Sequence, residues 1–189
     1  QELQTTTAQI SAYGQVQSSF AKIQDSGKAL AATQSTTSTA DLKKNLQTFV
    51  NAYNDTRSAA ASTATGSAKT AVRDLQSSLS TDSARADLKS LGITRNSDGS
   101  LTLDTKALDS ALQSNDGTAN SAAKRIGSTA AQSATTALST TGSIASSLSA
   151  LNAREASLEN RQATQQQQLA ESQQQVAQAS NFLSSALSG

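Results

Sequence analysis

Acidic side chains are the residues of this sequence whose type and spacing come nearest to catalytic chemistry. Asp104 and Asp109 lie close together along the chain, as do Glu155 and Glu159, and two neighbouring carboxyl groups can act as general acid and general base. Such work requires a buried site that shifts a carboxyl pKa, whereas carboxylates in a polar, exposed sequence are usually solvated surface charges. We therefore expect no catalytic residue, and a hydrolase built on these pairs is poorly supported.

Metal and cofactor chemistry is equally poorly provided for. Asn96, Asp98 and Asp104 surround Gly99 and resemble part of a calcium loop, but the ligand spacing and terminal glutamate of an EF-hand are missing. The chain contains no His, Cys, Met, Trp or Pro, which removes the commonest general base, the thiol nucleophile and the soft metal ligands. We expect neither a metal nor a cofactor.

The composition predicts a thin molecule that acts by contact. Ala, Ser, Thr and Gln make up well over half of the 189 residues, and 33 large apolar side chains remain once the 34 alanines are set aside, too few for a thick core. Lys plus Arg total 15 and Asp plus Glu total 14, so no net field favours nucleic acid or an anionic membrane. We see no membrane span and no secretory signal, so an exported form would leave by another route.

The first half of the chain predicts two long helices. A stripe with helical spacing extends from Leu3 to about Ala32, and it consists of Leu3, Ile10, Tyr13, Val16, Phe20, Ile23 and Leu30. A Ser/Thr-rich connection follows at 33–39, in which Ser38 is placed to cap a second helix with Asp41. That second helix carries Leu42, Leu46, Phe49, Val50 and Tyr53 on one face. Residues 59–67 form either a loop or a frayed extension of it.

The middle of the chain predicts a short helix, a β-hairpin and another short helix. Val72, Leu75 and Leu79 indicate the first short helix. In the segment 88–112, residues 93–94 and 101–103 alternate in hydropathy around a polar centre, and Asp98-Gly99 supplies the positive φ of a hairpin turn, although the loop can be longer than two residues. Asp104 is placed to cap a helix bearing Leu108, Ala111 and Leu112, which Asn115-Asp116-Gly117 ends.

The last third predicts an alanine-rich helix and then a long heptad repeat. Alanine dominates residues 118–141, so packing there should be close and shallow, and Gly142-Ser143 interrupts. One heptad position reads Ile144, Leu151, Leu158, Gln165, Ser172, Ala179 and Ala186, and the other reads Leu148, Glu155, Gln162, Leu169, Val176 and Leu183. Residues at these two heptad positions form the seam of a coiled coil. The middle of this seam is polar, whereas its two ends are apolar.

The end of this seam is the candidate functional site. Four of the five aromatic residues lie on apolar stripes and should pack in a core, but Phe182, with Leu183 and Leu187, lies where no partner within the chain is evident. We hypothesise that this cluster contacts another subunit. The predicted partner or oligomer interface comprises Leu148, Leu151, Leu158, Leu169, Val176, Phe182, Leu183 and Leu187.

The order of these segments resembles the flagellar filament-cap family, that of hook-associated protein 2. The similar segments are SAYGQVQSSFAKIQ at 11–24, FVNAYND at 49–55, LKSLGITRNSDGSLTLDTKALDSAL at 88–112, TGSIASSLSALNAREASLENR at 141–161 and NFLSSAL at 181–187. The third segment is the closest match, since the family shows a Leu-Gly-Ile start, an Asp-Gly turn and a Leu-x-Leu-Asp strand. The family also has a β-rich insertion between its first two helices and a segment upstream of the first, where this chain has only the connector 33–39 and a shortened start.

The resemblance implies a structural protein of the bacterial flagellum that retains the module facing the filament and lacks the outer domains. It implies an extracellular place reached through the flagellar type III apparatus, a role in motility and a link to cell adhesion. The implied partners are further copies of the chain in a ring, flagellin or hook–filament junction proteins, and a type III export chaperone, with no nucleic acid and no membrane span. The alternative hypothesis is a secreted helical adhesin or type III translocator-like protein that acts on a host surface or membrane.

We therefore predict a mainly α fold, an elongated antiparallel helical bundle or coiled coil with one small β-hairpin. Residues 1–58 and 141–189 should form a coiled-coil stalk. Residues 59–140 should form a small helical domain with the hairpin near 91–104. The first and last helices should pack along their apolar stripes.

Overall fold

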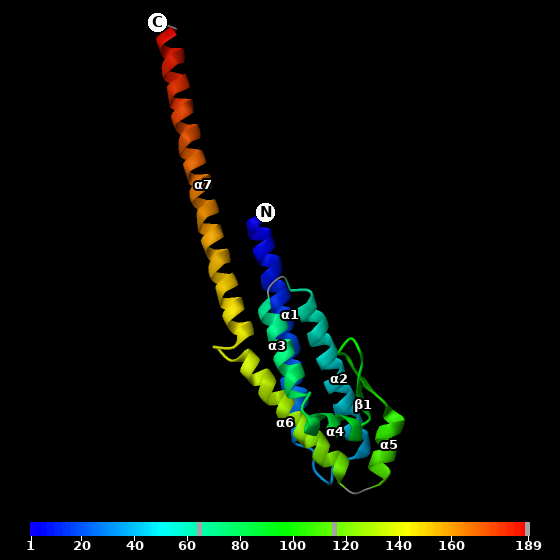
Figure 1. Ribbon diagram of the computed structural model, residues 1–189. Helices are drawn as coiled ribbons and strands as arrows, with labels where there is room; N and C mark the ends of the chain where they lie inside the picture. Colours follow the sequence, from blue (N-terminus) through cyan, green and yellow to red (C-terminus); the bar gives the residue numbers. More distant parts are fainter. Residues whose placement is uncertain (64–65, 115–116, 188–189) are drawn as a thin grey trace.

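A computed structural model describes residues 1–63, 66–114 and 117–187 and shows an elongated, mainly helical molecule with one antiparallel hairpin (Figure 1). This confirms the predicted fold class. The elements in chain order are α1 (Glu2–Ala31), α2 (Thr39–Ala61), α3 (Gly66–Ser78), α4 (Asp82–Ser90), β1 (Ile93–Arg95), β2 (Leu101–Leu103), α5 (Thr105–Gln113), α6 (Thr118–Leu138) and α7 (Ser143–Leu187).

The capping residues expected from the sequence begin the helices they were assigned to. The Ser38 hydroxyl accepts from the Asp41 backbone N–H at 3.1 Å and donates to its carboxylate at 2.7 Å, which starts α2. Asp104 Oδ1 accepts from the N–H groups of Lys106 and Ala107 at 2.9 and 3.1 Å, which starts α5. Both caps satisfy N–H groups that a helix leaves unpaired at its first turn.

Helix α4 at residues 82–90 was not predicted from the sequence. Thr81 caps it by accepting from the Ala84 N–H at 3.2 Å, and only Ala84, Asp87 and Leu88 are buried on its inner face. A helix of little more than two turns with so few apolar residues gives almost no periodic signal.

The connection between α2 and α3 proved to be partly helical. Helix α2 continues through Ala61, and α3 begins at Gly66, so the first part of the uncertain segment 59–67 extends the helix. Residues 64–65 lie outside the described residues, as do Asn115 and Asp116, to which we assigned the end of α5.

The hairpin has the expected strands and a longer loop. Ile93 pairs with Leu103 and Arg95 with Leu101, which leaves residues 96–100 in the loop. Gly99 adopts a φ of +82°, a conformation that glycine reaches without strain.

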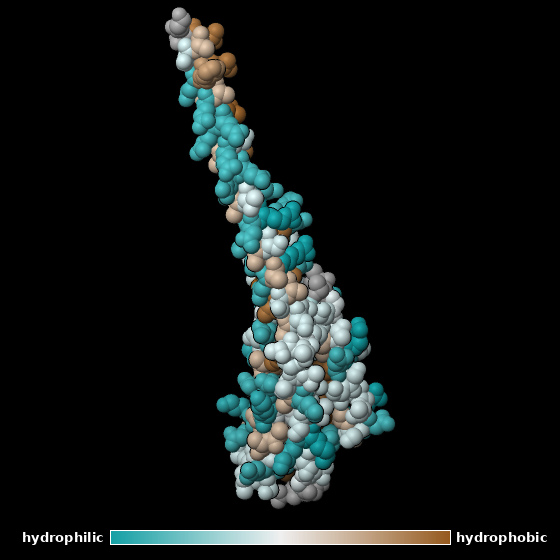
Figure 2. Space-filling model, turned by 90° about the vertical axis from the view of Figure 1, so that its left-hand side faces the viewer, coloured by the Kyte–Doolittle hydropathy of each residue, from teal (hydrophilic) through white to brown (hydrophobic). Residues whose placement is uncertain are grey.

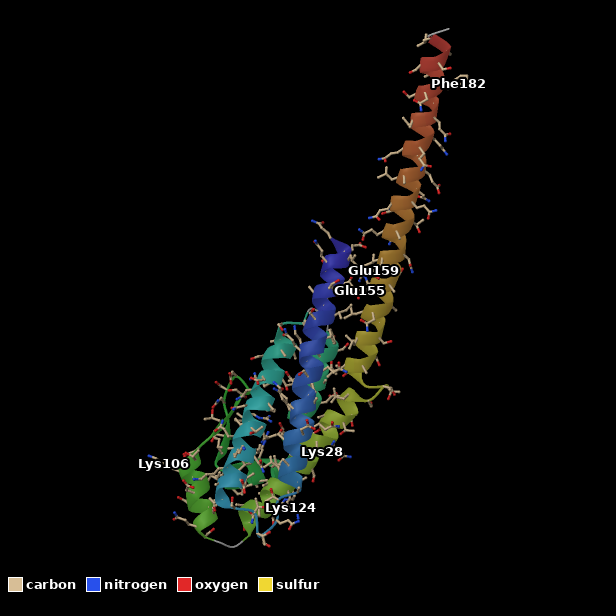
Figure 3. All side chains as sticks on the ribbon, turned by 180° about the vertical axis from the view of Figure 1, so that it is seen from behind. Lys28, Lys106, Lys124, Glu155, Glu159 and Phe182 are labelled. Atoms are coloured by element: carbon tan, nitrogen blue, oxygen red, sulfur yellow. The ribbon has the colours of Figure 1, made fainter. Side chains whose placement is uncertain are left out.

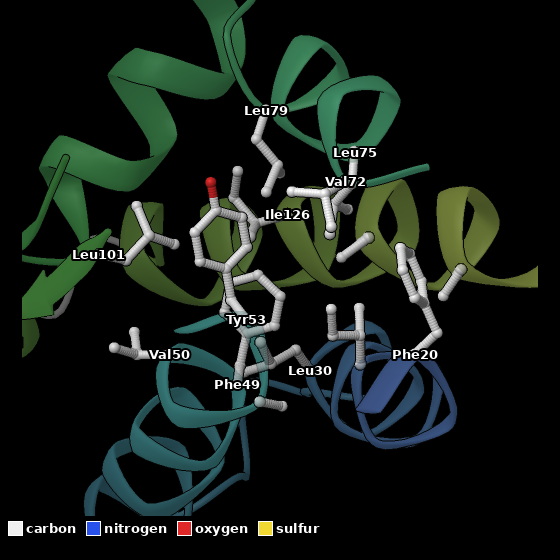
Figure 4. Close-up of a cluster of buried hydrophobic side chains, with 14 of the residues drawn as sticks. Phe20, Leu30, Phe49, Val50, Tyr53, Val72, Leu75, Leu79, Leu101 and Ile126 are labelled. Atoms are coloured by element: carbon white, nitrogen blue, oxygen red, sulfur yellow. The ribbon is translucent and has the colours of Figure 1, made fainter. Parts of the chain in front are cut away.

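The helices surround one continuous apolar core (Figure 4). Tyr13, Phe20, Phe49 and Tyr53 are at most 1% exposed, which confirms that these aromatics pack inside. The other largest fully buried side chains are Ile23, Leu30, Leu42, Leu46, Leu75, Leu79, Leu91 and Leu101. This core crosses the boundary that we predicted between residues 58 and 59, and the division into a stalk and a small domain stays a prediction.

Helices α1 and α6 pack closely because each carries a glycine at the crossing. A Cβ on Gly127 would lie 2.5 Å from the Gly27 carbonyl oxygen and 2.6 Å from the Ala31 nitrogen. A Cβ on Gly27 would lie 2.8 Å from the Gly127 carbonyl oxygen. The close packing expected of the alanine-rich segment is therefore present, and α1 packs more extensively on α6 and α2 than on α7.

Helix α7 runs antiparallel to α1 and extends well beyond it (Figure 1). Its first turns lie against α1 and α3. From residue 159 to residue 187 every side chain is exposed. The molecule is thus a helical body with a projecting helix. No helix in the described ranges is both long and apolar enough to cross a membrane.

Candidate assembly surface on helix α7

The first part of the heptad seam is occupied by the chain's own body. Ile144 is fully buried, Leu151 is 9% exposed, and Leu148 packs against the core. Leu158 is half-buried and marks the end of this packed part. Three predicted interface residues, Leu148, Leu151 and Leu158, therefore belong wholly or partly to intramolecular packing.

A polar seam residue has a partner within this packed part. The Thr7 hydroxyl of α1 donates to Glu155 Oε1 of α7 at 2.8 Å. A carboxylate at a seam position costs little when it accepts such a bond at the edge of the core. Figure 3 shows Glu155 on the side of α7 that faces α1. The contact joins α7 to the first part of α1.

The five remaining predicted residues form an exposed apolar stripe, hereafter the distal stripe. It comprises Leu169 (60% exposed), Val176 (67%), Phe182 (73%), Leu183 (60%) and Leu187 (88%). In the described part of the chain these are the exposed large hydrophobic residues. Figure 2 shows hydrophobic side chains gathered towards the free end of α7, above a polar stretch.

The spacing of the distal stripe suits a partner helix. Leu169, Val176 and Leu183 recur every seven residues, so they follow one line along α7. Ala179 and Ala186 occupy the alternate seam position and let another helix approach closely. Burying one Leu, Val or Phe side chain contributes about 1.5–3 kcal/mol, so a helix that covered all five would be held firmly.

The segment that carries the distal stripe is almost uncharged. Between residues 161 and 187 only Arg161 and Glu171 carry charge, and the Gln173 to Gln175 run lies within helix. A surface of this kind binds by apolar contact and amide hydrogen bonds rather than by electrostatic steering.

Three of the four carboxylates that the sequence singled out, Asp104, Asp109 and Glu155, have structural partners. Asp104 caps α5, and Asp109 forms an ion pair with Lys43 of α2. Glu155 accepts from Thr7, and Glu159 is exposed at the end of the packed part. Since Asp104, Asp109 and Glu155 are each engaged by a different neighbour and Glu159 is exposed, the arrangement does not bring two carboxyl groups onto one reacting atom.

The residues that resembled a calcium loop stabilise the hairpin loop instead. Asp98 Oδ1 accepts from the Ser100 N–H at 2.9 Å and from its hydroxyl at 2.7 Å, and these bonds lower the pKa of Asp98. Asn96 donates to the hydroxyls of Ser100 and Thr102 at 2.8 and 2.9 Å. The loop is thus ordered by its own side chains.

The charged contact between α4 and α6, like the Lys43–Asp109 pair, was not predicted from the sequence. Arg125 of α6 donates from Nε and Nη2 to the two oxygens of Asp87 at 2.8 and 2.6 Å. Asp87 is buried whereas the Arg125 side chain is 55% exposed, and these bonds raise the pKa of Arg125. The contact ties α4 to α6, and nothing in the spacing of two residues 38 positions apart could have paired them.

Comparison with known proteins gives one match. A family model described as the flagellar hook-associated protein 2 C-terminus matches residues 63–188, two thirds of the chain. No curated protein and no solved structure matches. The matched region contains the hairpin and all of the distal stripe, whereas α1 and α2 precede it.

Proposed function

This chain belongs to the flagellar hook-associated protein 2 family, and we propose that it works as a filament-cap-like component that self-associates and contacts flagellin to support filament assembly. Members of this family are structural proteins of the bacterial flagellum at the filament tip, exported through the flagellar apparatus. A structural role agrees with the elongated helical fold, in which Asp104, Asp109 and Glu155 bind neighbouring residues of the chain.

The distal stripe is the observation that supports the proposal most. Leu169, Val176 and Leu183 extend the seam of α7 past the body, where only another segment or molecule can cover them. Apolar side chains exposed at this density are typical of assembly surfaces. A protein that caps a filament needs such a surface, because its subunits must hold one another and the flagellin below.

The remaining partners follow from this role. Copies of the chain would form a ring, with flagellin or hook–filament junction proteins as neighbours and a type III export chaperone before secretion. A chaperone would cover the same apolar stripe, since its exposure before assembly favours aggregation. The place of action would be outside the cell, on the flagellum.

Complementation tests the proposal. The chain is expressed in a motile bacterium whose own cap gene is deleted, and filaments are counted by electron microscopy while its export into the medium is measured. We expect filaments with the native chain and none with the Leu169→Gln, Val176→Gln, Leu183→Gln variant. The control variant carries Gln167→Ala and Gln174→Ala on the opposite face and should behave as the native chain.

The complementation result and a vesicle assay together distinguish the proposal from the alternative hypothesis of a translocator-like protein. An exported native chain that restores no filaments would contradict the proposal. Release of dye from vesicles of anionic lipid by the purified chain would favour a translocator-like protein instead. A capping protein should leave such vesicles intact.

A further inference from the structure

Backbone hydrogen bonds join the two strands of the hairpin at both of its ends. The Asp104 N–H donates to the Gly92 carbonyl at 2.8 Å, and the Asn96 N–H donates to the Ser100 carbonyl at 2.9 Å. Gly92 has a φ of +69°, and a Cβ there would lie 2.6 Å from the Asp104 carbonyl oxygen, so the turn into β1 requires glycine. Residues 92–104 therefore hold their shape through bonds made among themselves.

The backbone groups on the edge of β2 that faces away from β1 are hydrogen-bonded by a side chain of α2. In an antiparallel ladder, hydrogen-bonded and non-bonded residue pairs alternate. Because Asn96 bonds to Ser100 and Asp104 to Gly92, the Arg95–Leu101 pair is a non-bonded one, and the Leu101 N–H and C=O point away from β1. Asn54 of α2 meets both groups, since its Oδ1 accepts from the Leu101 N–H and its Nδ2 donates to the Leu101 carbonyl, each at 2.9 Å.

Two neighbours of Asn54 hold the hairpin loop from the same helix. The Tyr53 hydroxyl donates to the Gly99 carbonyl at 3.2 Å, and Arg57 donates to the Asp98 carbonyl. Burial raises the pKa of Tyr53, which keeps its hydroxyl protonated and able to donate. The attachment of the loop to α2 is thus made by side chains that bind backbone carbonyls.

A second attachment joins the hairpin to α3. Arg95 donates from Nη1 to the Ser80 hydroxyl at 2.5 Å and from Nη2 to the Gln76 carbonyl at 3.2 Å. That carbonyl belongs to the last turn of α3 and also accepts from the Ser80 hydroxyl at 2.5 Å. Since Arg95 is exposed, water can replace these bonds at little cost, whereas the bonds of Asn54 are partly shielded.

We infer that Asn54 is a positioning residue that takes the place of a third strand, and that its loss makes the hairpin with α5, residues 92–113, open from the helical body as one unit more often, against the burial of Leu101 and Leu108. Asn54 lies outside the region matched by the family model. It therefore couples the unmatched helix α2 to the matched hairpin. The amide also covers a strand edge that would otherwise be open to pairing.

Hydrogen exchange measured by NMR on the full chain tests this inference. In Asn54→Ala, the protection of the Leu101 and Leu108 amides should fall by about 10- to 100-fold, the loss expected for two hydrogen bonds. The Ile23 amide in α1 should keep its native protection. The matched control is Asn51→Ala, one turn earlier on α2 and exposed, which should change neither.

A second variant distinguishes hydrogen bonding from packing. Asn54→Asp keeps the shape but sets a carboxylate oxygen against the Leu101 carbonyl, so at pH 7 the hairpin should open at least as readily as in Asn54→Ala. Protection should return as the pH falls and the carboxyl group becomes a donor.

Three results would overturn the inference. The first is a change of less than about twofold at Leu101 in Asn54→Ala. The second is an equal loss at Ile23, which includes complete unfolding of the variant. The third is an Asn54→Asp variant whose exchange at Leu101 does not depend on carboxyl titration.

Discussion

Replacing Gly127 by alanine is the most direct test of how the body is packed. The new Cβ would meet the Gly27 carbonyl oxygen at 2.5 Å, whereas ordinary contact begins at 3.4 Å, so α1 and α6 would have to separate by about 0.9 Å. The obstructing atoms are two backbone atoms and the Cβ of Leu30, none of which can rotate away. Movement of a whole helix would also loosen the neighbouring alanine contacts.

The size of the effect follows from two opposing terms. Overpacking of this kind costs about 3 kcal/mol, and alanine offsets about 1 kcal/mol of that because it forms helix better than glycine. The net loss is about 2 kcal/mol, which lowers the Tm of a protein of this size by about 4–8 °C. Gly14→Ala is the control, because nothing lies within 4 Å of a Cβ there, and it should raise stability by up to about 1 kcal/mol.

Urea unfolding followed by circular dichroism measures both variants, and the midpoint gives the change in the free energy of unfolding. A Gly127→Ala protein as stable as the native chain would refute the close crossing of α1 and α6. So would an equal loss in Gly14→Ala.

Further predictions concern the buried Tyr53, the turn at Gly142 between α6 and α7, and the distal part of α7. Because burial raises the pKa of Tyr53 above its ordinary value of 10.0, its contribution to stability is complete below pH 10 and is lost as the pH rises through the raised pKa; Tyr53→Phe should weaken this alkaline loss in unfolding curves. Gly142→Ala, whose Cβ would lie 2.4 Å from the Ala137 carbonyl oxygen, should cost about 1–3 kcal/mol in thermal unfolding. In the monomer, amides between residues 165 and 185 should exchange with less than about tenfold protection, because an isolated helix is marginal in water; protection as strong as that of Phe20 would contradict this.

The long helices were predictable because each carries its own signal. The stripe from Leu3 to Leu30 has helical spacing, and Ser38 and Asp104 are capping residues placed at element starts. The hairpin was predictable from Asp98-Gly99 between two alternating segments. Each of these features depends on neighbours along the chain.

The contacts between distant segments were not predictable. The crossing at Gly27 and Gly127 depends on two glycines that the sequence shows only as weak points in helices. The pairing of Asn54 with the Leu101 backbone produces no periodic pattern in the sequence. A single polar residue on a helix gives no sign of whether it faces solvent or binds another segment. The residues of the distal stripe were visible in the sequence, because an apolar heptad shows whether or not a partner covers it; that they form an interface stays a prediction.

The mass of the purified chain in solution tests the central claim most directly. In sedimentation velocity over a range of concentrations, the native chain should form discrete oligomers that dissociate on dilution. The Leu169→Gln, Val176→Gln, Leu183→Gln variant should remain a monomer with an unchanged Tm. Equal oligomer sizes for the native chain and this variant would show that the distal stripe is not the assembly surface.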